Sequence, residues 1–103
     1  MEALFTMKYS FHPEAELELN QAIDYYENCA EGLGYDFAVE VYSAVERIVA
    51  YPKAWAKLTD AVRRCLTRRF PYGVLYTEEP GGIHIIAVMH LHRDPDYWKH
   101  RSG

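Results

Sequence analysis

The sequence has few of the features that mark secreted or membrane proteins. It contains only two cysteines, Cys29 and Cys65, which is too few for the disulfide framework of a small secreted domain. No apolar run approaches the roughly 20 residues that a membrane-spanning helix needs. The N-terminal residues also lack the basic start and apolar stretch of a signal peptide. We therefore expect a cytoplasmic protein with reduced thiols and no membrane contact.

The sequence also contains no metal-binding motif, internal repeat or low-complexity segment. His90 and His92 share one face of an expected strand and could approach His84 or Cys65, but a metal site needs three or four convergent ligands. We accordingly expect no metal and no cofactor. With 103 residues and no linker-like segment, the chain is expected to form a single domain over residues 1–103.

Charge is distributed unevenly along the chain. Residues 1–50 contain two basic and ten acidic side chains, whereas residues 51–103 contain nine basic and five acidic ones, so the net charge of −4 combines −8 with +4. A basic half joined to an acidic half suggests a surface that faces a polyanion. The nine tyrosines are many for this length and suggest a protein interface.

The first half of the sequence is predicted to be mainly helical. A short strand is expected over Lys8–Phe11, with a start that could lie as early as Leu4. Pro13 then opens a helix, because proline has no N–H to lose in the first turn, and residues 32–34 end it. A second helix is expected from about Tyr35 to just before Pro52. The apolar stripes that should be buried are Ala15, Leu19, Ala22, Ile23 and Tyr26 in the first helix, and Phe37, Val41, Ala44, Val45 and Ile48 in the second.

The second half is predicted to form most of a sheet. Strands are expected over residues 62–69, 72–78 and 83–92, with a Pro-Gly-Gly turn between the last two. The last strand is apolar on both faces, with residues 83, 85, 87, 89 and 91 on one and 86 and 88 on the other, so it should be central. Pro95 begins a C-terminal turn or short helix. The result is an α+β fold in the order β-α-α-β-β-β, in which an antiparallel sheet of about four strands carries a helical hairpin on one face.

Several short segments follow one another in an order and at a spacing typical of one family. These segments are FHPEAELEL, AIDYYE, GLGYDF, RRFPYGVLY and AVMHLHRDPDYWKHR. From Lys8 to Arg101 the chain resembles the RelE/ParE superfamily, the toxins of bacterial type II toxin–antitoxin systems, which are often called plasmid stabilisation proteins. The resemblance implies a growth-inhibiting toxin that a cognate antitoxin neutralises, with no membrane partner. A homodimer is a further expectation.

The resemblance implies two different targets. RelE-like members cleave messenger RNA, usually on the ribosome and without a metal, whereas ParE-like members poison DNA gyrase. Ribonuclease chemistry needs a base, an acid and cations around one phosphate, and His titrates near neutral pH. The candidate catalytic residues are Arg64, His90, Arg93 and Tyr97, and the candidate phosphate-binding or target-binding residues are Arg63, Arg68 and Arg69. We expect the four catalytic candidates to converge on one edge or face of the sheet.

Two departures argue against RNA cleavage. Gly73 follows Tyr72 where RelE-type enzymes often carry an arginine, and Leu91 occupies a second position that is often basic. Three functions therefore stay open: a gyrase-binding toxin, a RelE-type endoribonuclease and a decayed module that only binds the antitoxin. The arginines could also be solvated surface residues, and Tyr97 could pack the C-terminal turn against the sheet. Expected anchors for the antitoxin are Tyr25, Tyr35, Tyr42 and Tyr51.

Overall fold

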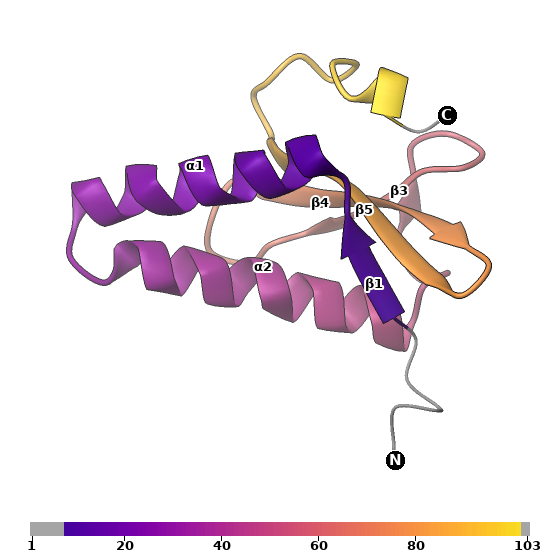
Figure 1. Ribbon diagram of the computed structural model, residues 1–103, viewed down its shortest axis with the longest axis horizontal. Helices are drawn as coiled ribbons and strands as arrows, with labels where there is room; N and C mark the ends of the chain where they lie inside the picture. The colour runs from indigo at the N-terminus through magenta and orange to yellow at the C-terminus, as the bar shows by residue number, and fades with distance from the viewer. Residues whose placement is uncertain (1–7, 102–103) are drawn as a thin grey trace.

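The computed structural model describes residues 8–101, which form two helices and a five-stranded sheet. The elements, in chain order, are β1 (Lys8–Phe11), α1 (Pro13–Cys29), α2 (Leu33–Ala50), β2 (Ala56–Lys57), β3 (Arg63–Leu66), β4 (Tyr72–Glu79), β5 (Gly82–His90) and the 3-10 helix η2 (Lys99–Arg101). Figure 1 shows α1 and α2 lying antiparallel and side by side, and together they cover one face of the sheet. The predicted α+β class and helical hairpin are confirmed. The part of the first expected strand that precedes Lys8 lies outside the described residues.

Helix α1 begins where the sequence predicts, and a histidine caps it. Pro13 is its first residue, and the Nδ1 atom of His12 accepts a hydrogen bond from the backbone N–H of Glu14 at 3.0 Å. This bond satisfies one of the N–H groups that a helix leaves without a partner at its start. In the predicted stripe, Ala15, Leu19 and Ala22 are buried, whereas Ile23 and Tyr26 are half-buried at the margin of the core.

Helix α2 begins at Leu33, two residues before the expected start, because α1 itself supplies its cap. The Glu27 carboxylate accepts hydrogen bonds from the backbone N–H groups of Gly32 and Gly34, at 2.9 and 3.0 Å. Gly34 is therefore not part of the helix stop but lies within the first turn of α2. A Cβ atom at this position would lie 2.6 Å from the backbone oxygen of Ile23. The close approach of the two helices thus requires glycine here.

The strand order β1-β5-β4-β3-β2 corrects one part of the sequence prediction. Strand β1 pairs with β5 in parallel, and the other pairings are antiparallel, so the sheet is mixed. The helical hairpin carries the chain away from β1, and only the last strand returns to pair with it. The short strand β2 makes a fifth member that was not expected. Strand β5 lies between β1 and β4, which confirms its predicted central place.

A bulge in β5 changes which of its side chains share a face. Leu75 pairs with Ala87 and Tyr76 pairs with Ile85, so Ile86 is an extra residue on β5. Ile83, Ile85 and Val88 consequently belong to the core beneath the helices, whereas Ile86, Ala87 and Met89 belong to a second cluster on the opposite face. The strict alternation expected along this strand was therefore wrong beyond Ile85.

Strands β3 and β5 end earlier than the apolar pattern suggests. Beyond Leu66, the backbone N–H groups of Arg68 and Arg69 donate to the Glu40 carboxylate of α2, at 2.8 and 3.0 Å, instead of continuing the sheet. Strand β5 ends at His90. The C-terminal segment then crosses the sheet face away from the helices, where Trp98 is only 2% exposed. Neither described helix is long and apolar enough to cross a membrane.

Two isoleucines test this core. Ile48 is fully buried in α2, whereas Ile23 of α1 is half-buried at the margin of the same core. We expect Ile48→Ala to lower the free energy of unfolding by about 2–5 kcal/mol, because a buried cavity remains. Ile23→Ala should cost clearly less. Urea unfolding of both variants measures the difference, and an equal loss would contradict the described packing.

Candidate functional site

Three of the four catalytic candidates lie together where β5 ends. His90 and Arg93 line one surface hollow beside α1, which Glu18 and Tyr72 also line. Tyr97 joins them because the Arg93 guanidinium carbon lies 3.8 Å from the centroid of its ring. A cation over the face of an aromatic ring is attracted by the ring quadrupole. The end of β5 thus gathers an imidazole, a guanidinium and a phenol.

Arg64, the fourth candidate, lies on the face of the sheet opposite to His90. It lines a cavity together with Met89 and Trp98, which belong to the second apolar cluster. The neighbouring residue Cys65 belongs instead to the core under the helices. Since adjacent strand residues point to opposite faces, Arg64 does not share a phosphate with the group at the end of β5.

The three candidate phosphate-binding arginines are also separated. Arg63 donates to the backbone oxygens of Lys53 and Trp55, at 3.1 and 2.8 Å, and thereby holds the loop before β2. The Arg69 guanidinium lies 3.4 Å from the Asp36 carboxylate of α2. The side chain of Arg68 is exposed. These residues hold loops against neighbouring elements or face solvent, and they do not form one anion site.

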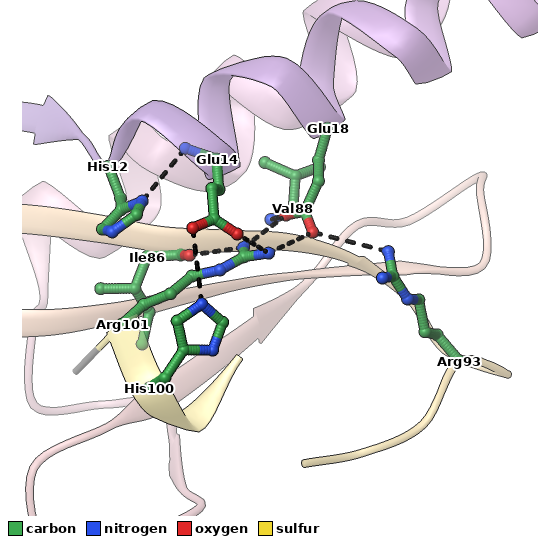
Figure 2. Close-up of polar contacts among 8 residues, drawn as sticks. All are labelled: His12, Glu14, Glu18, Ile86, Val88, Arg93, His100 and Arg101. Atoms are coloured by element: carbon green, nitrogen blue, oxygen red, sulfur yellow. Dashed lines mark hydrogen bonds and ion pairs between the residues drawn. The ribbon is translucent and has the colours of Figure 1, made fainter. Parts of the chain in front are cut away.

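The strongest polar contact in this region was not predicted. Figure 2 shows that Arg101 of η2 meets Glu18 of α1 in a two-pronged ion pair, with both nitrogen–oxygen distances at 3.0 Å. The Arg101 side chain is 4% exposed and that of Glu18 is 11% exposed. Paired guanidinium and carboxylate groups with two parallel bonds are among the strong hydrogen-bonded pairs in proteins. This pair closes the C-terminal segment onto the first helix.

The same pair completes the open edge of β5. Strand β1 covers this edge only as far as Ile85, whose backbone oxygen accepts from the N–H of His12 at 2.8 Å. Beyond that point, Glu18 accepts from the N–H of Val88 and Arg101 donates to the oxygen of Ile86, both at 3.0 Å. Two side chains thus provide the acceptor and donor that a neighbouring strand would provide (Figure 2). Buried backbone groups need such partners.

Further charged groups surround the Glu18–Arg101 pair. The Glu14 carboxylate lies 3.2 Å from Arg101 and 3.4 Å from His100. The hydrogen bond with His100 lowers the pKa of the Glu14 carboxyl group, and the charge of Arg101 lowers this pKa further. Arg93 lies 3.7 Å from the second oxygen of Glu18. The positive charges at this end of the sheet are therefore already matched by carboxylates of α1.

Tyr97 is poorly placed to donate a proton to a substrate. Its hydroxyl group is buried beside the Glu18 carboxylate. Burial raises the pKa of the phenol strongly, and the nearby Glu18 carboxylate raises it further. The Tyr97 ring lies close to two guanidinium groups. The guanidinium carbon of Arg101 in η2 is 5.0 Å from the ring centroid, and that of Arg93 is 3.8 Å from it. Tyr97 thus packs the C-terminal turn against the sheet.

One sequence signal could have identified Glu18. It lies on the same helical face as Ala15, Leu19 and Ala22, which are all buried, and a carboxylate on a buried stripe needs a cationic partner. Arg101 offers no comparable local signal.

Residues 8–101 contain no group of three or more His, Cys, Asp or Glu side chains placed to hold a metal ion.

The Glu18–Arg101 pair can be tested by truncation. We expect Arg101→Ala to lower the free energy of unfolding by about 3–5 kcal/mol, because it leaves the Glu18 carboxylate and the Ile86 oxygen without their partner. Arg93→Ala is the matched control, since that side chain is 53% exposed and exposed pairs contribute about 1 kcal/mol or less. Thermal and urea unfolding measure both values. Equal losses would show that the buried pair does not stabilise the fold.

Comparison with known proteins agrees with this architecture. A family model described as the ParE toxin of the type II toxin–antitoxin system, parDE, matches residues 9–95. A solved structure described as the chromosomal ParDE TA system from P. aeruginosa is similar with a TM-score of 0.70 at 15% sequence identity, covering 84% of this chain and 97% of that one. No curated protein sequence gives a significant match. The chain therefore belongs to the ParE toxin family of type II toxin–antitoxin systems.

Proposed function

We propose that this toxin inhibits growth by binding DNA gyrase, that it cleaves no RNA, and that a cognate antitoxin neutralises it. Gyrase is the target that its resemblance to ParE-like toxins implies. The main support is the ion pairing at the end of β5, where the carboxylates of Glu14 and Glu18 hold the buried guanidinium group of Arg101. Cations that face carboxylates are not available to stabilise the charge that develops on a cleaved phosphate.

The position of Arg64 supports the same proposal. A ribonuclease needs its acid, base and cations around one phosphate. Arg64 and His90 belong to opposite faces of the sheet, and the hydroxyl of Tyr97 is buried. The guanidinium group of Arg64 can still contact a protein target, because binding a protein does not require Arg64, His90 and Tyr97 to converge.

RelE-type RNA cleavage is the second candidate, and one observation favours it. His90 and the half-exposed Arg93 line the same hollow. An imidazole and a guanidinium at one site could serve as a general base and a phosphate contact. This route would require Arg93 to leave Glu18 when RNA binds.

The target can be identified by inducing the gene in a bacterial host, with and without the antitoxin gene expected beside it. We expect growth arrest that the antitoxin relieves, together with double-strand DNA breaks, an SOS response and inhibition of purified gyrase. No new messenger RNA ends should appear. His90→Gln is the discriminating variant, since it removes the proposed base of a nuclease. RNA cut sites that vanish in this variant would overturn the gyrase proposal and favour the nuclease.

We further propose that the antitoxin binds an exposed apolar row on α2. Tyr35, Val39 and Tyr42 recur at helical spacing and are 73%, 44% and 42% exposed. A row at spacings of four and three residues is a typical docking face for another segment, and aromatic residues often dominate such interfaces. Tyr25 and Tyr51, the other expected anchors, are also exposed.

The double variant Tyr35→Ser, Val39→Ser tests this surface. We expect it to bind the antitoxin about tenfold more weakly or worse, since exposed apolar anchors often contribute 1–2 kcal/mol each. Glu46→Ser is the control, because this exposed residue of the same helix is not apolar. Calorimetric titration with the purified antitoxin measures the affinities. Unchanged binding of the double variant would place the antitoxin elsewhere.

A further inference from the structure

Arg64 is a partly buried cation without a partner. Its Nε atom is buried and unpaired, and its guanidinium group makes no hydrogen bond or ion pair within residues 8–101. Leaving the Nε donor unpaired costs free energy, because this atom has lost water and gained no acceptor. The two terminal nitrogens of the guanidinium group are not among the buried unpaired atoms, and they remain able to meet a partner. Arg64 therefore differs from Arg63, Arg69, Arg93 and Arg101, which all have carboxylate or carbonyl partners.

Gly73 makes room for this arginine. A Cβ atom on Gly73 would lie 2.8 Å from Cδ and 2.9 Å from Cγ of Arg64, closer than carbon atoms can pack without movement. The Arg64 stem thus lies flat across β4, over the residue that pairs with Leu66. The sequence suggested that Gly73 stands where a phosphate-binding cation has been lost. In the structure, the absence of a Cβ atom at this position leaves room for the stem of a different cation, Arg64.

The cavity that Arg64 lines is otherwise largely apolar. It has a volume of about 200 Å³, and Leu58, Met89, Pro95 and Trp98 contribute to its walls. Trp98 brings a second unpaired donor, since its indole Nε1 is buried without a hydrogen-bond partner while the residue is 2% exposed. Two residues that line this cavity thus each carry a buried donor without a hydrogen-bond partner within residues 8–101.

The surroundings favour one kind of acceptor. Asp96 and Lys99 at the rim are 3.2 Å apart, so Arg64 is the charge without a counterpart. Leu58 and Leu66, on either side of Arg64, are 37% and 46% exposed. A planar carboxylate matches the guanidinium fork, and apolar neighbours of that carboxylate would cover the leucines. A nucleic-acid phosphate fits less well, because adjacent phosphates would each need a cation of their own.

We propose that the Arg64 cavity is a docking site for an acidic side chain of a protein partner, with apolar residues on both sides of that acidic residue in the partner's sequence. The carboxylate pairs with the Arg64 guanidinium at the mouth of the cavity, and the flanking residues cover Leu58 and Leu66. The proposal does not depend on whether the toxin acts on gyrase or on RNA. It assigns a separate surface, on the sheet face opposite the helices.

The two tryptophans provide a direct readout. We would titrate ¹⁵N-labelled protein with the peptide acetyl-Leu-Asp-Leu-Glu-Leu-amide and follow both indole N–H signals by NMR. The Trp98 signal should shift saturably. The Trp55 signal should not, because its indole already donates to the Arg47 oxygen at 3.3 Å. The amide counterpart, acetyl-Leu-Asn-Leu-Gln-Leu-amide, should bind at least about tenfold more weakly, as expected if one charged pair is lost.

Variants separate this site from general electrostatics. Arg64→Gln should weaken binding of the acidic peptide about tenfold, whereas Lys57→Gln, which removes an exposed charge on the adjacent strand, should not. Gly73→Ala should also weaken binding although Arg64 is still present, because the new methyl group displaces its stem. An unchanged Trp55 signal shows that each variant is folded. Three results would each overturn the proposal. The amide peptide could bind as tightly as the acidic peptide, inorganic phosphate or an oligonucleotide could displace the acidic peptide, or the Trp98 signal could stay unshifted.

Discussion

The ion pair between Glu18 and Arg101 is the contact on which the arrangement of the sheet depends. Strand β1 is only four residues long and leaves the second half of the β5 edge uncovered. Glu18 and Arg101 supply the acceptor and the donor that this edge lacks. Because the same two side chains neutralise each other, their burial costs less than the burial of either charge alone would. Helix α1, the central strand and the C-terminal turn are thereby joined at one place.

This structural role explains why the basic residues near the C-terminus do not form a reactive group. Arg93 and Arg101 face carboxylates of α1, and both guanidinium groups lie close to the Tyr97 ring. A positively charged sequence segment is thus balanced locally by the acidic first half of the chain. The charge asymmetry that suggested a polyanion-facing surface is largely an interaction within the molecule. Arg64 also has no side-chain partner within residues 8–101, and it lies on the other face of the sheet.

Most elements could be predicted because local chemistry specifies them. Pro13 opens α1, the Pro-Gly-Gly turn joins β4 to β5, and the apolar stripes of both helices form the core. The parallel pairing of β1 could not be predicted, since it depends on residues about seventy positions apart and on no local pattern. The bulge at Ile86 was hidden because an uninterrupted apolar run gives no sign of where alternation shifts. The expected convergence of the four candidate residues was met only in part. His90, Arg93 and Tyr97 lie together, but Arg64 does not join them, and the carboxylate partners on α1 were missed.

The link between Glu18 and Arg101 spans 83 positions of the chain, and this has a consequence for synthesis. A nascent chain that lacks Arg101 carries a helix whose Glu18 carboxylate has no counterpart and a central strand with an open edge. Strand β1 likewise has no strand to pair with until β5 has been made. Contacts this distant in sequence are slow to form, and this one requires that synthesis has passed Arg101. Newly made protein therefore acquires the Glu18–Arg101 contact, and with it the closed edge of β5, only after Arg101 has been synthesised.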